Sequence, residues 1–480
     1  MKIKQWMSLY LENNNFIRHV TILSGASVVA QLINIVSMPI VSRLYSPNDF
    51  GVLALYSSIV GLLATISGFR YYLVIPLVRR ERYIQALAWL SLISQCFCVL
   101  TFAIIIEICK MYLEDTSYGV LLPYRYLIPV GVLCVGIYST VVQWAIREKE
   151  FTLIAKTKLV QTVSRCSIFF MCGFINAAPI GLLLGDIAGQ SGGSTSIFYS
   201  IMKKIQKVKF SFTHIKRAAL SYRKMFLFDT PSSLINMSGA YLLPIIMTYY
   251  WIPDIVGSFS MAQQVLALPS AVIGTAIGQV FIQRCSQAKH DGNIEVLYLK
   301  TLKLLFITGV GPILLISMLA PVLFPIILGS KWAEAGKFAM MMSPWVALNF
   351  IYSPLSMIYV IMMLQRPAFV FLSLYTIARI ASLYIMRGNP DCAIELLSGV
   401  GAFFMVVGII WPGYFIYIKI SSLISIITCL SVNVLIALAP VYFCLYVFKN
   451  IPIYATIIAM LLSMALYIWL GVKTLKNIKK

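Results

Sequence analysis

Four arginines stand inside long apolar stretches of this 480-residue sequence: Arg70, Arg125, Arg165 and Arg379. An ionised side chain at the centre of a bilayer costs about 2.5–3.5 kcal/mol on insertion scales, so it normally faces a polar interior. Guanidinium is a planar, permanently charged fork that fits phosphate oxygens. Arg165 and Arg379 lie deepest, and we expect some of the four to line a cationic cavity. The alternatives are snorkelling to the bilayer surface, mainly for Arg70 and Arg125, and pairing with an acid.

Two carboxylates belong to the same stretches. Asp186 lies in the middle of one, where it could bind a coupling proton or sodium ion. A salt bridge between Asp186 and Arg165 explains the position equally well. Asp229 is a second candidate for ion coupling, but it precedes Thr230, Pro231 and Ser232 at an expected helix start. That position favours a helix N-cap, because a carboxylate there accepts hydrogen bonds from free backbone amides.

Amide side chains within the apolar stretches mark possible faces of a polar interior, among them Gln31, Asn34 and Gln263. Amides can hydrogen-bond the hydroxyl groups of a sugar, but they also join helices to one another inside membranes. No phosphate-binding loop or dinucleotide fingerprint occurs, and the histidines fall in polar connections away from any metal-ligand cluster. The sequence therefore predicts no cofactor and no metal site.

These residues need a scaffold of membrane-spanning helices. The chain is 60% hydrophobic and 11% charged, whereas soluble proteins are about 45–50% apolar and about 25% charged. Apolar runs recur that can cross about 30 Å of hydrocarbon, and backbone in lipid must satisfy its own hydrogen bonds as a helix. We therefore predict an all-α polytopic membrane protein with about fourteen transmembrane helices. The expected spans are Val20–Val41, Phe50–Phe69, Ile84–Cys109, Val120–Ile146, Phe151–Phe174, Pro179–Met202, Phe228–Trp251, Ile255–Ile282, Thr301–Leu328, Phe338–Leu364, Ala368–Met386, Ala393–Ile418, Ser421–Phe448 and Ile453–Val472.

The positive charges indicate the orientation of the chain. Its net charge of +22 would suggest nucleic-acid binding in a soluble protein. Here Lys and Arg concentrate in every second connection and at both termini, as they do on the cytoplasmic side of membrane proteins. We therefore predict cytoplasmic N- and C-termini and no nucleic-acid partner. The longest connection, 203–224, is predicted to be a basic amphipathic segment on the inner membrane surface, attracted to anionic lipid.

Two stretches of the chain, 39–51 and 244–257, share a pattern. Each ends one helix, turns on a proline and an aspartate, and opens the next helix near a glycine. Both follow a helix that starts inside, so the repeats are parallel, and two six-helix bundles related in this way form a transporter layout. The predicted parts are an N-lobe at 1–202, the basic linker at 203–224, a C-lobe at 225–418, and two extra helices with a basic tail at 419–480.

Two motifs carry a resemblance to a known family, Arg43–Tyr56 at the second span and Phe259–Phe281 in the eighth. With the expected helix count and the two parallel halves, the chain resembles the polysaccharide (O-antigen-type) flippases. These belong to the multidrug/oligosaccharidyl-lipid/polysaccharide (MOP) exporter superfamily. The resemblance implies a multi-pass protein of the bacterial inner (plasma) membrane. It would move undecaprenyl-diphosphate-linked oligosaccharide repeat units from the inner to the outer leaflet by alternating access.

The same resemblance implies a role in O-antigen, capsule or exopolysaccharide synthesis, with a polysaccharide polymerase and a chain-length regulator as partners. The diphosphate or an acidic sugar would then be the ligand of the cationic cavity. A cation-coupled drug or metabolite antiporter of the same superfamily is the alternative, and it would need a smaller pocket and a defined cation site. An O-antigen polymerase or membrane glycosyltransferase is a third interpretation. Short outer loops without paired carboxylates favour a transporter over an enzyme.

Overall fold

The computed structural model describes residues 2–78, 81–205, 212–291, 293–443, 458–467 and 469–470. Within these ranges the chain is helical, with short turns and no strand. Nine described segments are long and apolar enough to cross a membrane, or ten if the bent pair Pro253–Leu266 and Ser270–Ile282 forms one span. The all-helical, multi-pass architecture is confirmed. The count of fourteen and the cytoplasmic termini stay predictions, and the last two expected spans fall partly outside the described residues.

The chain forms two compact units, Met1–Gly257 and Ser258–Lys480. The boundary lies later than the expected linker at 203–224, because helix α9 (Thr230–Tyr250) packs along α2 (Pro47–Ile66) within unit 1. The division into two six-helix lobes stays a prediction.

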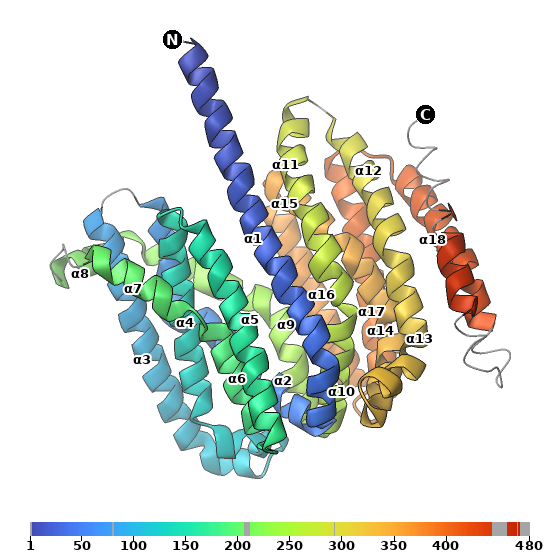
Figure 1. Ribbon diagram of the computed structural model, residues 1–480, viewed down its shortest axis with the longest axis horizontal. Helices are drawn as coiled ribbons and strands as arrows, with labels where there is room; N and C mark the ends of the chain where they lie inside the picture. Colours follow the sequence, from blue (N-terminus) through green and yellow to red (C-terminus); the bar gives the residue numbers. More distant parts are fainter. Residues whose placement is uncertain are drawn as a thin grey trace. The chain divides into compact units, whose positions relative to one another are not determined.

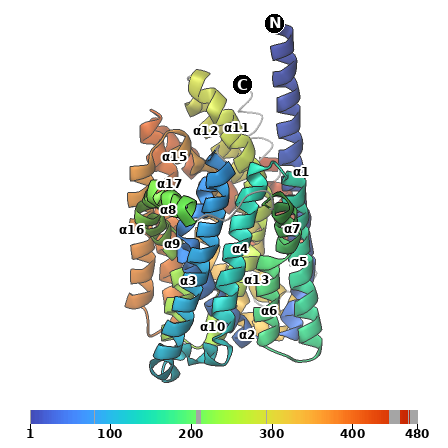
Figure 2. The ribbon, with the colours of Figure 1, turned by 90° about the vertical axis from the view of Figure 1, so that its left-hand side faces the viewer.

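Unit 1 is a bundle of packed helices (Figures 1 and 2). Its other helices are α1 (Lys2–Leu44), α3 (Glu81–Glu114), α4 (Leu127–Arg147), α5 (Phe151–Phe174), α6 (Ile180–Ser191), α7 (Ser194–Ile205), α8 (Phe212–Ser221) and the start of α10 (Pro253–Leu266). Shorter helical segments are the 3₁₀ turns at Ser67–Leu77 and Ser117–Tyr124 and the π-helical turn at Met225–Asp229. Helix α1 packs against α5, α5 against α6, and α3 against α4.

The motif that opens the second span folds as a capping box. The Ser46 hydroxyl accepts a hydrogen bond from the Asp49 amide at 3.3 Å, and the Asp49 carboxylate accepts one from the Ser46 amide at 2.8 Å. Pro47 stands in the first turn of α2, where a missing N–H leaves no hydrogen bond unmade. The Ser-Pro-Asn-Asp pattern is therefore a helix start, with both free amides satisfied.

The two turns of the sequence repeat meet inside unit 1. The first turns of α2 and α10 cross so closely that a Cβ at Gly51 would lie 1.9 Å from the Pro253 carbonyl oxygen. A Cβ at Gly257 would lie 1.8 Å from the Pro47 carbonyl oxygen. Each glycine thus faces the proline carbonyl of the other copy. We call this reciprocal contact the Gly–Pro crossing.

The expected span at Pro179–Met202 is instead two helices, and this prediction was wrong. Helices α6 and α7 have 12 residues each, and at 1.5 Å per residue neither crosses about 30 Å of hydrocarbon. The break falls at Gly192 and Gly193, where Gly193 has a φ of +74°. A Cβ at Gly192 would lie 2.9 Å from Cα of Gln161 on α5, so the backbone approaches that helix too closely for a larger residue.

Helices α7 and α8 lie across one end of the unit 1 bundle (Figure 1). Ile215 and Ala218 of α8 are buried in a core cluster with residues of α3, α4 and α5. On the other side of the same helix, Phe212, Lys216 and Arg217 are exposed. The described part of the 203–224 segment is therefore an amphipathic helix with an exposed basic face, while residues 206–211 lie outside the described residues.

Attraction of α8 to anionic lipid stays a prediction and can be measured. We expect the double variant Lys216→Gln/Arg217→Gln to lose about 1 kcal/mol of surface attraction per removed charge. Hydrogen exchange of α8 should then be slower in nanodiscs of phosphatidylglycerol than of phosphatidylcholine for the wild type and for the control variant below, and equal in both lipids for the double variant. Arg366→Gln, another exposed cation, serves as the control. Equal exchange of wild-type α8 in both lipids would contradict the assignment.

Unit 2 has α14 at its centre, packed between α13 and α17. Side chains of α14 such as Phe338 and Phe350 are fully buried. Gly309 lets the ring of Phe350 approach, since a Cβ there would lie 2.0 Å from it. The helices of unit 2 are the rest of α10, α11 (Thr275–Asp291), α12 (Ile294–Leu305), α13 (Gly311–Ile327), α14 (Ala333–Leu355), α15 (Met357–Ile361), α16 (Gln365–Ile385), α17 (Pro390–Phe415) and α18 (Ile420–Tyr442), with π-helical turns at Ser270–Gly274 and Phe306–Val310.

Candidate functional site

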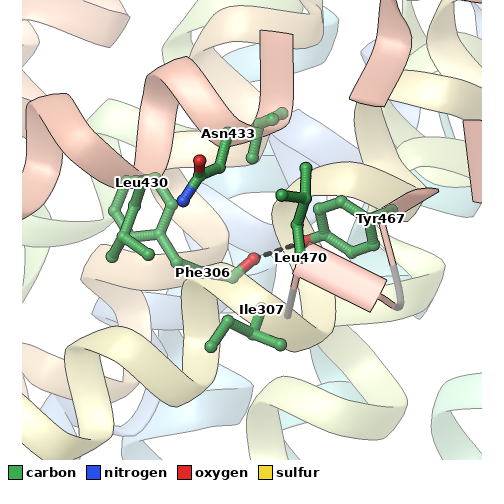
Figure 3. A pocket seen from close by; sticks show the side chains of 7 residues that line it. Phe306, Ile307, Leu430, Asn433, Tyr467 and Leu470 are labelled. Carbon is green, nitrogen blue, oxygen red and sulfur yellow. Dashed lines mark hydrogen bonds between the residues drawn. The ribbon is translucent and has the colours of Figure 1, made fainter. Parts of the chain in front are cut away.

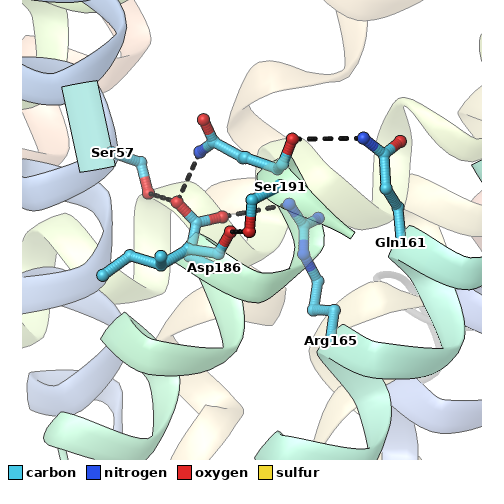
Figure 4. A network of polar contacts seen from close by, with 7 residues as sticks. Ser57, Gln161, Arg165, Asp186 and Ser191 are labelled. Atoms are coloured by element: carbon cyan, nitrogen blue, oxygen red, sulfur yellow. Dashed lines mark hydrogen bonds and ion pairs between the residues drawn. The ribbon is translucent and has the colours of Figure 1, made fainter. Parts of the chain in front are cut away.

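Arg165 and Asp186 form a buried polar network with their neighbours (Figure 4). The Arg165 guanidinium lies 3.0 Å from one carboxylate oxygen of Asp186. The other oxygen accepts hydrogen bonds from Gln190 Nε2 at 2.6 Å and from the Ser57 hydroxyl at 3.4 Å. The network joins α5, α6 and α2. The salt bridge considered for Asp186 is therefore present, and any coupling ion would have to compete with it.

A glycine of α6 and a second cation of α5 are also notable. Gly189 makes room for the guanidinium, because a Cβ there would lie 2.3 Å from Arg165 Nε. That Nε is buried and has no hydrogen-bond partner among the described residues. Lys158, two turns earlier on α5, donates to the Ser27 hydroxyl of α1 at 3.0 Å. Sequence reasoning missed Lys158, although a lysine in the middle of an expected span carries the same signal as an arginine.

Arg70 lies in a break at the end of the second span and pairs with Asp229. Three consecutive residues, Gly68, Phe69 and Arg70, have φ values of 72°, 47° and 56°. The left-handed conformation costs a non-glycine residue about 1–2 kcal/mol, so this backbone is strained. Arg70 Nε lies 2.6 Å from the Asp229 carboxylate, which belongs to the π-helical turn before α9.

The N-cap interpretation of Asp229 was wrong. Its backbone is helical and its side chain makes no capping hydrogen bond. The helix does not start at Asp229, since the π-helical turn Met225–Asp229 runs directly into α9. Its carboxylate is consequently available to Arg70.

Gln95 supports the break from α3. Its side chain is fully buried, and Nε2 donates to the Gly136 carbonyl and the Thr140 hydroxyl, both at 2.9 Å. A Cβ at Gly68 would lie 2.9 Å from the same Nε2. Sequence reasoning did not single out Gln95, though a glutamine within an apolar run was the available signal. Irregular backbone at membrane depth is tolerated where protein or a water-filled cavity covers it.

Arg125 forms an ion pair with the partly exposed Glu107. It lies between Tyr124 and the start of α4, with Nε 2.9 Å from the Glu107 carboxylate and Nη2 2.9 Å from the Tyr126 hydroxyl. The Glu107 side chain is half exposed. Exposed ion pairs contribute about 0–1 kcal/mol, so this pair fits the structural alternative considered for Arg125.

Arg379 is the most buried cation among the described residues of unit 2, with 4% of its surface exposed. Its Cζ atom lies 4.0 Å from the ring centre of Trp345 and 5.2 Å from that of Tyr375. The Trp345 indole donates to the Tyr375 hydroxyl at 2.9 Å, which fixes the two rings. Nε and Nη2 of Arg379 have no hydrogen-bond partner among the described residues. A buried charge in this state is an anomaly, because such groups are normally paired.

The three amide side chains predicted for a polar interior lie outside the Arg165–Asp186 network. Gln31 and Asn34 are half-buried on α1, and Gln263 is exposed on α10. None of them contributes a hydrogen bond to the network of Figure 4. In the described part of the chain no group of His, Cys, Asp or Glu could hold a metal ion.

Unit 2 also contains two apolar hollows at α18 and the helical stretch 458–467. One, in Figure 3, is lined by residues including Phe306, Leu430 and Asn433. The other, of about 160 Å³, is lined by residues including Leu315 and Met464. Tyr467 borders both, and its hydroxyl donates to the Phe306 carbonyl. The walls are mostly apolar, with Asn433 in the first hollow and Ser463 in the second as polar exceptions, so they suit an apolar chain better than a sugar.

Comparisons with known proteins agree with this architecture. Residues 40–337 match a family described as polysaccharide biosynthesis protein, while no curated protein matches by sequence. Among solved structures, the lipid II flippase MurJ in an inward closed conformation is similar at a TM-score of 0.75. It has 12% identity, and the alignment covers 95% of this chain and 99% of that one.

Two MOP superfamily transporters share the fold less closely. An inward-facing multidrug resistance MATE family transporter has a TM-score of 0.52 with 14% identity, over 82% of this chain and 94% of that one. A transporter from Pyrococcus furiosus has a TM-score of 0.51 with 12% identity, over 83% and 95%. At these identities the likeness shows the fold alone, which this chain shares with the three transporters. Since the family match covers more than half of the sequence, the chain belongs to the polysaccharide biosynthesis protein family.

Proposed function

We propose that this protein is a flippase for undecaprenyl-diphosphate-linked oligosaccharide repeat units. It moves them from the inner to the outer leaflet of the bacterial plasma membrane by alternating access, for O-antigen, capsule or exopolysaccharide synthesis. The family match over residues 40–337 carries the proposal, because it ties the chain to polysaccharide synthesis. The MOP fold supports transport rather than catalysis.

The chemistry of the chain fits an amphipathic substrate. Arg70, Lys158 and Arg165 place three cationic groups within unit 1 against the two carboxylates that pair with the arginines, and such groups bind diphosphates. The larger apolar hollow of unit 2, of about 160 Å³, suits a short part of a lipid chain. In this proposal the repeat unit is bound by cationic and amide side chains, and the isoprenoid stays in an apolar environment.

The test is the sidedness of lipid-linked repeat units in cells depleted of the protein. Spheroplasts are treated with an impermeant oxidant, and the protected lipid-linked pool is weighed by mass spectrometry. Complete units should accumulate on the inner leaflet, and their mass then identifies the sugars. Accumulation of single units on the outer leaflet would instead indicate a lost polymerisation step and overturn the proposal.

A cation-coupled antiporter of drugs or metabolites is the second candidate. The buried Asp186 favours it, because a membrane-embedded carboxylate can carry a coupling ion. Depletion would then leave the lipid-linked pool unchanged, while export of a small solute would depend on a proton or sodium gradient. The Arg165–Asp186 salt bridge weighs against this candidate, since it already neutralises the carboxylate.

Arg379 provides a test that separates binding from structure. Replacing it with methionine removes two unmatched buried donors, each costing about 1–3 kcal/mol, against a cation–π gain of about 0.5–2 kcal/mol. We expect Arg379→Met to raise the thermal unfolding midpoint and yet abolish export, measured as surface polysaccharide. Arg387→Met, an exposed arginine against Tyr384, should change neither. Intact export by Arg379→Met would exclude Arg379 from the substrate site.

A further inference from the structure

The Arg70–Asp229 pair differs from the Arg165–Asp186 pair of unit 1 in how firmly its acid is held. Asp229 accepts one hydrogen bond from Arg70, through Nε, at 2.6 Å. The side chains of Arg70 and Asp229 keep 20% and 40% of their surface exposed. In the second pair Arg165 keeps 33%, so the difference lies in the acids: Asp186 keeps 11% and accepts additional hydrogen bonds from Gln190 and Ser57. The Arg70 pair is therefore open to exchange with an external anion, whereas the Arg165 pair is held on several sides.

Both partners of the open pair stand on irregular backbone. Arg70 ends the left-handed break that begins at Gly68, and Asp229 ends the π-helical turn Met225–Asp229. The aromatic rings of Phe69 and Phe226 pack edge to face beside the pair, with centroids 4.6 Å apart. Interrupted helices supply the ligand-binding groups of many transporters, because their backbone and charges can face a cavity. The strain lies on the Arg70 side alone, since Asp229 has ordinary helical dihedral angles within its π-helical turn.

We propose that Arg70 binds a phosphate group of the substrate, and that Asp229 is an internal anion occupying the same guanidinium until the substrate arrives. This inference rests on the proposed function and adds the residue that receives the diphosphate. A diphosphate brings more than one negative charge and several acceptor oxygens, so it can use the fork of the guanidinium where Asp229 uses one edge. On binding it displaces the carboxylate, and on release Asp229 returns.

The mechanism predicts opposite effects from removing the two partners. Without its carboxylate, the variant Asp229→Asn loses a competitor and should bind a diphosphate more tightly, by about tenfold. Without its guanidinium, Arg70→Gln should bind it more weakly, by about tenfold or more. Adding or removing one charge-assisted hydrogen bond commonly changes affinity by this order. If the pair were only structural, both variants would weaken binding or leave it unchanged.

The experiment uses the full-length protein in nanodiscs, with affinity measured by native mass spectrometry. The probes are undecaprenyl diphosphate, inorganic pyrophosphate and phosphatidylglycerol. Glu107→Gln is the matched control, because it removes the acid of the Arg125 pair, a hydrogen-bonded pair of similar length at 2.9 Å. It should leave all three affinities at the wild-type value. Thermal unfolding of each variant confirms that the compared proteins are folded.

Opposite shifts for undecaprenyl diphosphate support the inference. If pyrophosphate follows the same pattern, the phosphate group alone is recognised, and if it does not, the lipid is needed as well. If the two variants change the affinity for phosphatidylglycerol as much as the affinity for undecaprenyl diphosphate, the effect is general electrostatic attraction. That result would overturn the inference. Wild-type binding of undecaprenyl diphosphate without opposite shifts would overturn the inference alone. Absence of that binding in every folded variant would overturn the proposed function as well.

Discussion

Replacing Arg165 with methionine is expected to destabilise the protein by about 3–5 kcal/mol, because it leaves the buried carboxylate of Asp186 without its counter-charge. Asp186→Asn should be milder, since a third of the Arg165 side chain is exposed and can be solvated. The measurement is thermal unfolding of purified protein in detergent, together with its amount in the membrane.

A double variant tests whether the loss of stability comes from the unpaired carboxylate. Arg165→Met/Asp186→Asn removes both charges and should recover most of the stability lost in Arg165→Met. A pair that contributes nothing would give additive effects in the double-mutant cycle. If the doubly neutral protein is stable and still exports polysaccharide, Asp186 is not an ion-coupling residue.

The second large effect is expected at the Gly–Pro crossing. An alanine at Gly51 or Gly257 would put a methyl group 1.8–1.9 Å from a backbone oxygen, and a backbone atom cannot rotate aside. Overpacking of side chains costs about 1–3 kcal/mol, and we expect each alanine variant to exceed that range. Protein abundance in the membrane and the unfolding midpoint should both fall.

Gly25→Ala is the control for the crossing. Beyond its own stretch of α1, no described atom lies within 4 Å of a Cβ at Gly25. This variant should therefore match or slightly exceed the wild type in stability, as alanine favours helices. If Gly51→Ala were as stable as Gly25→Ala, the close approach of α2 and α10 would be wrong.

Much of this architecture follows from patterns in the sequence. Apolar runs predicted the helices, and the turn on proline and aspartate predicted that a helix opens near Gly51, although α2 already starts at Pro47. The pairing of Arg165 with Asp186 was a foreseeable alternative, because opposite charges in adjacent spans have few other partners. These features are local or nearly local, which is why sequence reasoning reaches them.

Other features depend on packing that no local pattern encodes. Asp229 resembles an N-cap in sequence, yet it pairs with Arg70, 159 positions earlier. Gly192 and Gly193 lie within an apolar run, so the sequence predicted one continuous span across the break that they form. The two aromatic rings that contact Arg379 belong to different helices, Trp345 to α14 and Tyr375 to α16. Each of these features depends on how helices that are distant in the sequence pack against one another.

The reciprocity of the Gly–Pro crossing bears on how such a chain could arise. A contact in which Gly51 meets Pro253 and Gly257 meets Pro47 is self-complementary, like the interface of a two-fold symmetric dimer. A single half-length ancestor carrying one proline and one glycine would satisfy it by pairing with its own copy. Fusion of two such genes would preserve the interface without any new residue, and afterwards neither half could lose its glycine independently.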